Sequence, residues 1–126
     1  MIDHVSVAVS DLVRSIAFYD AVLAPVGLAR LVTCEASAGY GKAYPEFWIN
    51  LRAGHQGPAG DPGAHVCLRA RDETAVHAFH AAALAHGGTD SGPPGARRAA
   101  MTIYVGAFVL DPDRNKIEVM TVPRES

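Results

Sequence analysis

The 126-residue sequence predicts an α+β fold made of two similar halves, each with the element order β-α-β-β-β. The first observation is an internal repeat, since a shift of 61 residues places His4-Val5 on His65-Val66 without a gap. Between His4 and Gly27 nine positions are then identical, namely His4/His65, Val5/Val66, Asp11/Asp72, Ala17/Ala78, Phe18/Phe79, Ala21/Ala82, Leu23/Leu84, Ala24/Ala85 and Gly27/Gly88. A fixed offset of this size indicates a duplicated supersecondary unit.

The second observation is that both copies have the pattern of a strand followed by a capped helix. Residues 4–9 (HVSVAV) alternate valine with small or polar residues, as in a strand covered on one face. Asp11 is placed to cap the following helix, and Gly27 is placed to end it in a left-handed conformation. In the second copy Asp72 and Gly87-Gly88 take these places, and the apolar positions expected to be buried are Val76, Phe79, Ala83 and Leu84.

Three further strands complete the predicted first half. Residues 28–36 are expected to form a strand next to the first one, and residues 38–42 a turn or a short strand. Residues 47–51 (FWINL) are rich in aromatic and β-branched residues, which favour a strand.

The segment 53–63 (AGHQGPAGDPG) predicts the boundary between the halves, because four glycines and two prolines in eleven residues exclude regular structure. We therefore expect one domain, 1–126, composed of module 1 (1–55) and module 2 (63–126) with 53–63 as the linker. A chain of this length is sufficient to bury a core.

In the second half, residues 87 to about 100 are dense in glycine and proline and are predicted to be a loop. Residues 101–110 predict a strand, and residues 111–115 (DPDRN) a turn in which Asn115 is the residue able to take a left-handed conformation. Residues 116–120 predict the last strand.

Composition excludes several classes of partner. Charged residues make up 19% of the chain and the formal net charge is -2, so we expect neither a nucleic-acid nor a membrane partner. No run of 18 apolar residues occurs and no basic-then-apolar leader opens the chain, so a cytoplasmic location is expected. Cys34 and Cys67 are expected to be buried free thiols.

Strand alternation places three metal-competent side chains on the face of the sheets that the helices leave uncovered. If the valines of the first and fifth strands cover the helices, His4 and His65 point the other way, and so does Glu118 in the last strand. Two imidazoles and one carboxylate suit a divalent ion such as Zn, Ni, Mn or non-haem Fe(II). Because His4 and His65 occupy equivalent repeat positions, a pseudo-two-fold packing of the halves would bring them together.

Three motifs resemble a known family: 2–5 (IDHV) with Phe18-Tyr19, 64–66 (AHV), and 108–118 (FVLDPDRNKIE). The chain resembles the vicinal oxygen chelate superfamily, which includes glyoxalase I, extradiol dioxygenases, fosfomycin-resistance enzymes and bleomycin-binding proteins. The resemblance implies sheets that curl into a cup, a metal inside it, and His4, His65 and Glu118 as its ligands. Related folds commonly dimerise, so a homodimer is expected.

Two positions depart from the family pattern. The glyoxalase I branch takes a fourth ligand from the last strand of the first module, where the alignment by face places Trp48. Glu46 lies one alternation earlier on the same face and would substitute only in a different register. The family's turn usually has glycine where this chain has Arg114.

The resemblance implies a divalent-metal-dependent lyase or isomerase acting on a small carbonyl or diol substrate. Glu118 or Glu46 would serve as the base, and Tyr104 as a proton donor or an aromatic wall. Trp48, Arg69 and Phe108 are the candidates for substrate binding. One alternative is a metal-free protein that sequesters a small molecule in an aromatic-lined cup. The other is an extradiol-type dioxygenase.

Overall fold

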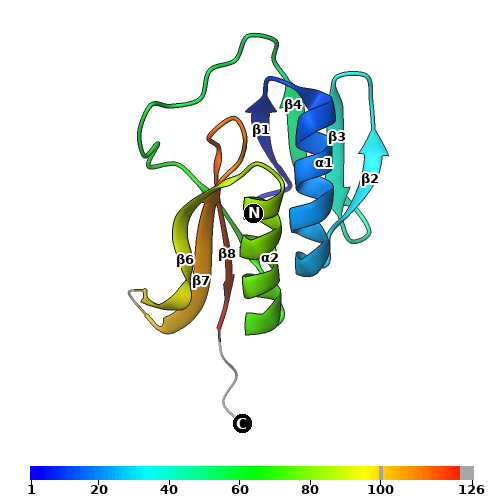
Figure 1. Ribbon diagram of the computed structural model, residues 1–126. Helices are drawn as coiled ribbons and strands as arrows, with labels where there is room; N and C mark the ends of the chain where they lie inside the picture. Colours follow the sequence, from blue (N-terminus) through cyan, green and yellow to red (C-terminus); the bar gives the residue numbers. More distant parts are fainter. Residues whose placement is uncertain (100, 123–126) are drawn as a thin grey trace.

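The computed structural model describes residues 1–99 and 101–122, and it confirms two βαβββ modules in tandem (Figure 1). The elements of the first half are β1 (Val5–Val9), α1 (Leu12–Leu23), the 3-10 turn η1 (Ala24–Val26), β2 (Ala29–Thr33), β3 (Ser37–Gly41) and β4 (Pro45–Leu51). Those of the second half are β5 (Val66–Arg69), α2 (Glu73–Ala85), β6 (Thr89–Arg98), β7 (Ile103–Leu110) and β8 (Lys116–Thr121).

The two halves have the same strand order. The first half forms a sheet ordered β1-β4-β3-β2, here called sheet A, and the second a sheet ordered β5-β8-β7-β6, here called sheet B. In each sheet the first strand runs parallel to the last one. The prediction that residues 28–36 lie next to the first strand is therefore wrong. β2 is mostly exposed and suits a sheet edge, whereas β4 contributes the buried Phe47 and Ile49 and takes the inner place beside β1.

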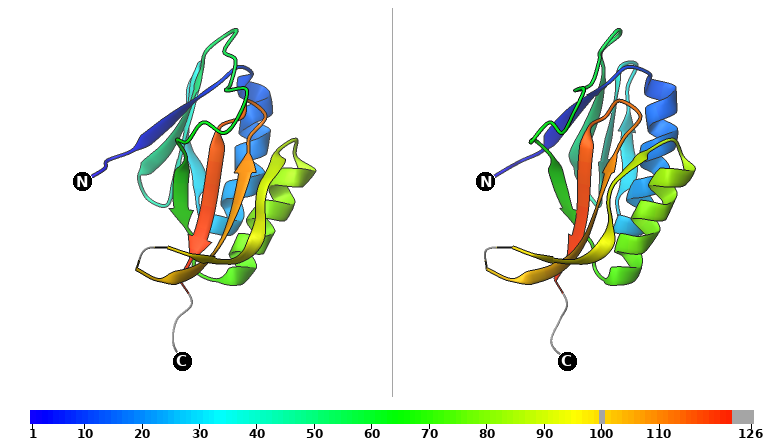
Figure 2. Two further views of the ribbon diagram at one scale, coloured as in Figure 1. Left: turned by 90° about the vertical axis from the view of Figure 1, so that its left-hand side faces the viewer. Right: turned by 60° about the vertical axis from the view of Figure 1, so that its left-hand side comes forward.

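Both helices pack against each other on one side of the strands (Figure 2). The predicted caps are confirmed, since Asp11 accepts from the Arg14 amide and Asp72 from the Ala75 amide. Gly27 has φ 88°, the left-handed conformation predicted for it. Leu84, expected in the buried stripe of α2, is 48% exposed because the helix instead turns Ala75, Val76, Phe79, His80 and Ala83 inward.

The prediction of a loop from residue 87 to about 100 is also wrong, because most of this segment forms β6. The strand holds two prolines, Pro93 and Pro94, which is tolerated because β6 is the edge of sheet B and these residues need not donate to a neighbouring strand. Its pairing with β7 shifts register around Gly92 and Gly95, so the ladder contains irregularities that a pattern of alternation does not reveal.

The turn between β7 and β8 ties module 2 to module 1. Asp111 is 2% exposed and its carboxylate accepts from the Tyr19 hydroxyl at 2.6 Å and from the Asn115 side chain at 2.9 Å. Asn115 also donates to the Ala8 carbonyl at 2.8 Å. The left-handed residue is Arg114, with φ 69°, and not Asn115 as predicted. The side-chain amide of Asn115 is instead used to join the modules.

Residues 52–65 contain no helix or strand, but the side of this segment that meets module 2 is held in place. The Arg114 guanidinium donates to the Pro58 carbonyl at 2.7 Å, and Lys116 donates to Asp61 at 3.0 Å. A side chain on Gly57 would collide with the Asp113 carbonyl, so the chain approaches the turn closely there. Among residues 1–99 and 101–122, no helix is long and apolar enough to cross a membrane.

Candidate functional site

A buried carboxylate on sheet B forms the centre of the candidate site. Glu118 is 5% exposed; its Oε1 lies 3.1 Å from His65 Nε2, and its Oε2 accepts from the Tyr104 hydroxyl at 2.9 Å. Its neighbours in β8, Ile117 and Val119, are fully buried in the core, so alternation turns Glu118 to the opposite face of the sheet. We call His65, Tyr104, Phe108 and Glu118 half-site B.

Gly106 explains how Tyr104 reaches the carboxylate. It lies between Tyr104 and Phe108 on the same face of β7, and a Cβ there would stand 2.8 Å from the Tyr104 ring and 3.2 Å from Glu118 Oε2. The absence of a side chain therefore lets the Tyr104 ring fold over the sheet to Glu118. Burial and the hydrogen bond that the Tyr104 hydroxyl donates to the Glu118 carboxylate raise the pKa of Tyr104, so the phenol stays a neutral hydrogen-bond donor.

Phe108 forms an aromatic wall beside this carboxylate. Its ring centroid lies 5.5 Å from that of His65, 5.3 Å from Arg97 Cζ and 5.0 Å from Lys116 Nζ. Sequence reasoning missed both cations. Lys116 stands two residues before Glu118 and so faces the same way, a signal that was present in the sequence. Arg97 was hidden because its segment was read as a loop.

The remaining predicted residues gather on sheet A, and we call His4, Glu46 and Trp48 half-site A. Trp48 is half-buried, pairs with Ser6 across β1 and β4, and covers Gly39 of β3. Glu46 is exposed and precedes it on the same face of β4. His4 is half-exposed and bonds to Asp3 at 2.7 Å.

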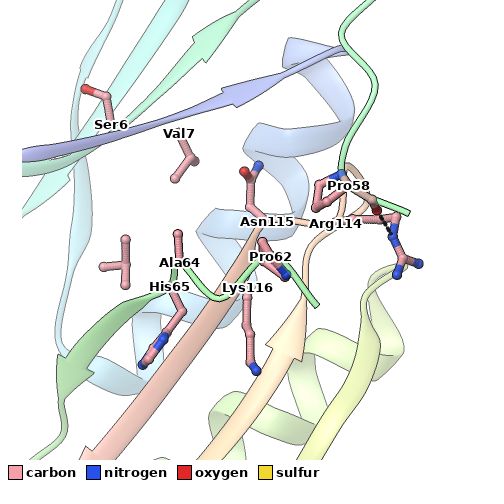
Figure 3. A pocket seen from close by; sticks show the side chains of 10 residues that line it. Ser6, Val7, Pro58, Pro62, Ala64, His65, Arg114, Asn115 and Lys116 are labelled. Carbon is pink, nitrogen blue, oxygen red and sulfur yellow. Dashed lines mark hydrogen bonds between the residues drawn. The ribbon is translucent and has the colours of Figure 1, made fainter. Parts of the chain in front are cut away.

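One chain does not bring the two half-sites together. Figure 3 shows the Ser6 side chain, which alternation places on the same face of β1 as His4, directed away from the His65 imidazole. Within the described parts of the chain, no three His, Cys, Asp or Glu side chains lie together in a group that could hold a metal ion. Of the three side chains predicted to bind a metal, one chain therefore brings together only His65 and Glu118, whose donor types suit a divalent ion.

Two cavities lie along the junction of the modules. The first, of about 240 Å³, lies between β1 and β5 beneath the linker, with His65 and Lys116 in its wall (Figure 3). The second, of about 550 Å³, is lined by the exposed Arg69 together with Lys42 and Arg71. Arg69, predicted to bind substrate, thus lines a cavity that contains no residue of half-site B.

Cys67 offers a test of the charge at half-site B. Both cysteines are free, and both are exposed rather than buried as predicted. The Cys67 thiol nevertheless lies beside Glu118, and the partial burial of the thiol together with that negative charge raises its pKa to about 12. With such a pKa the thiolate fraction at pH 8 is on the order of 10⁻⁴.

A thiolate of higher pKa is also the stronger nucleophile, which offsets part of this loss. We therefore expect Cys67, in a Cys34→Ser background, to react with iodoacetamide roughly a hundredfold more slowly at pH 8 than free cysteine does. Mass spectrometry of timed samples measures the rate. Adding Glu118→Gln removes the negative charge and should accelerate the reaction. A rate equal to that of free cysteine, or one unchanged by Glu118→Gln, would show that the two side chains do not interact.

Two βαβββ modules in tandem, each with a four-stranded sheet and one helix on the same side, define the class of fold to which this chain belongs. The chain belongs to the Glyoxalase/Bleomycin resistance protein/Dioxygenase superfamily, whose family model matches residues 1–119.

Solved structures agree with this assignment. A glyoxalase/bleomycin resistance protein from Albidiferax ferrireducens T118 is 34% identical, with a TM-score of 0.84 over 94% of this chain and 97% of that one. A V278E mutant of glyoxalase I from Zea mays is 25% identical, with a TM-score of 0.72 over 94% of this chain and 44% of that one. A glyoxalase-related enzyme from Fulvimarina pelagi, 19% identical with a TM-score of 0.73, shares the fold, covering 96% of this chain and 87% of that one. Among curated proteins, none matches the chain.

Proposed function

We propose that the protein is a divalent-metal-dependent lyase or isomerase that acts on a small carbonyl or diol substrate. The observation that carries the proposal is the buried Glu118 carboxylate, which His65 and Tyr104 hold on an open sheet face. A buried carboxylate beside an imidazole is a costly arrangement in a purely structural role, and such groups concentrate at functional sites.

The proposed site is shared between two copies of the chain. Half-site B of one copy supplies His65 and Glu118, and half-site A of the second supplies His4 as the third ligand. Two large apolar side chains near His4 are exposed, Ile2 at 80% and Tyr44 at 55%. Tyr44 lies close to His4 because its hydroxyl donates to Asp3, which precedes His4 in the chain. Exposed apolar side chains of this kind support a surface for a partner chain next to His4. In such a pairing Trp48 and Glu46 of the second copy would face half-site B of the first across the shared site.

The side chains of half-site B have separate tasks in this proposal. A divalent ion, when bound, would polarise the vicinal oxygens of the substrate as a Lewis acid. Tyr104, as a neutral phenol, would turn its hydroxyl from Glu118 to donate a hydrogen bond to a substrate oxygen. Glu118 accepts the substrate proton, with Glu46 of the second copy as the alternative base. Phe108 packs against the flat, carbonyl-bearing part of the substrate.

Mixing two inactive variants tests the shared site directly. His4→Ala and Glu118→Ala are each expected to bind little Zn²⁺, Ni²⁺, Mn²⁺ or Fe²⁺ when purified without added metal. In mixed dimers one of the two sites recovers all its ligands, so a refolded equimolar mixture should regain about a quarter of the wild-type metal content. Metal analysis together with light scattering measures both the content and the dimer.

A mixture that stays as empty as its parents would contradict a site shared between copies. Stoichiometric metal in wild type that persists in His65→Ala would overturn the metal assignment altogether. The matched control is His77→Ala, because His77 lies on the exposed face of α2 and belongs to neither half-site.

A second candidate function is a metal-free protein that sequesters a small molecule. It is favoured by the lack of a three-donor group within the described part of one chain and by the ring of Phe108 between two cations. Metal-free wild type that retains its ligand affinity in the presence of a chelator supports this candidate. The extradiol-type dioxygenase differs in requiring Fe²⁺ and oxygen consumption, which an oxygen electrode would detect.

A further inference from the structure

Phe108 stands between two cations that arrive from different strands. Arg97 belongs to β6 and Lys116 to β8, and these strands flank β7 on its two sides. Both cationic groups lie about 5 Å from the centroid of the ring, within the range of a cation–π contact. Two positive charges therefore lie against the ring, near the buried Glu118 carboxylate. The neutral ring attracts both of them but cannot neutralise either.

Arg97 lacks part of its hydrogen bonding. One of its terminal nitrogens donates to the Pro93 carbonyl at 2.6 Å, but its buried Nε has no acceptor among the described residues. Gly92 brings the edge strand against this side chain, since a Cβ there would stand 3.1 Å from the guanidinium. A buried guanidinium nitrogen without an acceptor is costly, so a group that supplies one is favoured here.

The charge of Lys116 is paired with an exposed carboxylate that an anionic ligand could displace. Its side chain is only 15% exposed, yet the acceptor it reaches, Asp61 in the linker, has a side chain that is 66% exposed. The carboxylate of Asp61 also accepts from the Gly63 amide, and these two contacts lower its pKa, so it is ionised at neutral pH. Within residues 1–99 and 101–122, Glu118 forms no ion pair with either cation, and its two oxygens contact His65 and Tyr104 instead.

We infer that the ligand of half-site B carries an anionic oxygen group, a carboxylate or a phosphate, which Lys116 and Arg97 recognise at the edge of Phe108. In the absence of ligand the Asp61 carboxylate takes the place of that group and forms an ion pair with Lys116. The inference rests on the proposed function only in taking half-site B as the place where the substrate binds. It assigns to Lys116 and Arg97 the selection of anionic over neutral substrates.

The test is a titration of metal-free protein with malonate, a dianion, and with malonamide, its neutral diamide, at low ionic strength. Removing metal with a chelator, and then dialysing the chelator away, separates this inference from the metal assignment. We expect malonate to shift the Arg97 Nε–H and Phe108 ring resonances in NMR spectra and to saturate, whereas malonamide leaves them unchanged. Malonate that shifts neither resonance would overturn the inference even if the protein binds metal.

Two variants with opposite effects sharpen the test. Lys116→Met should weaken malonate binding at least about tenfold, since it removes one charge of the pair. Asp61→Asn should tighten binding several-fold, because the competing carboxylate is lost. The charge-matched controls are Arg30→Met and Asp20→Asn, which alter a surface ion pair with a separation of 3.1 Å.

Each outcome decides for or against the inference. Equal affinities in wild type, Lys116→Met and Asp61→Asn would show general attraction to a charged surface and no recognition by this pair. Tight binding of malonamide would show that charge is not selected. If Lys116→Met does not fold, the tightening expected for Asp61→Asn still tests the same competition. A protein that binds malonate but never binds metal would retain this inference and lose the metal-dependent function.

Discussion

Replacing Glu118 by glutamine is expected to abolish stoichiometric metal binding, with an affinity loss of at least roughly a hundredfold. Loss of an outer-shell partner of a metal ligand alone costs about 10- to 100-fold, and Glu118 is proposed to be a ligand itself. The change removes the charge but keeps an oxygen that accepts from Tyr104, so the fold should persist. Metal content after dialysis, with competition by a chelator of known affinity, measures the effect.

The control for this substitution is Glu35→Gln, since Glu35 is exposed and lies outside both half-sites. It removes the same charge and should leave the metal affinity unchanged. Circular dichroism and thermal unfolding establish that the Glu118→Gln protein is folded. A folded variant that keeps the wild-type affinity would refute Glu118 as a ligand and leave the metal-free binding protein as the better account.

The second large effect concerns stability. Tyr19→Phe should lower the free energy of unfolding by about 2 kcal/mol, because hydrogen bonds to charged groups contribute about 1.5–3 kcal/mol and this one is fully buried. Burial raises the pKa of Asp111, which shows that its carboxylate depends on such donors to remain ionised. Asp111→Ala should cost more, since it leaves Tyr19 and Asn115 without their acceptor.

Thr33→Val is the control for this pair, because the Thr33 hydroxyl accepts a hydrogen bond from the charged Arg30 guanidinium at 2.7 Å in an exposed position. Water replaces a lost partner there, so urea unfolding should show no measurable change. Equal losses in Tyr19→Phe and Thr33→Val would mean that burial of the link between the modules adds nothing to stability.

Local patterns predicted the fold well because each depends on neighbours in the chain. The repeat around His4 and His65, and the caps at Asp11 and Asp72, follow from local spacing and from free amides at helix ends. The same logic failed for β6, because its prolines and glycines are typical of loops. Only the pairing with β7 at an exposed edge allows a strand there.

The sequence likewise predicted one part of the candidate site and not the other. Alternation along β8 was enough to turn Glu118, and with it Lys116, to the open face of sheet B. It was not enough to bring His4 to His65, since alternation fixes a face within one sheet and says nothing about how two sheets are oriented. The Asp61–Lys116 contact likewise joins residues 55 positions apart in the sequence, and no local pattern indicates it.

The sequence by itself determined the duplication, the strand and capped helix that open each module, and the faces of the strands, because these depend on periodicity and on backbone hydrogen bonds close in the chain. The tertiary structure alone decided which strands became edges, that Tyr19 and Asp111 fasten the modules, and that His65 meets Glu118 while His4 faces elsewhere. Those outcomes depend on the packing of sheets against helices and on contacts between residues far apart in sequence, which local propensity does not encode.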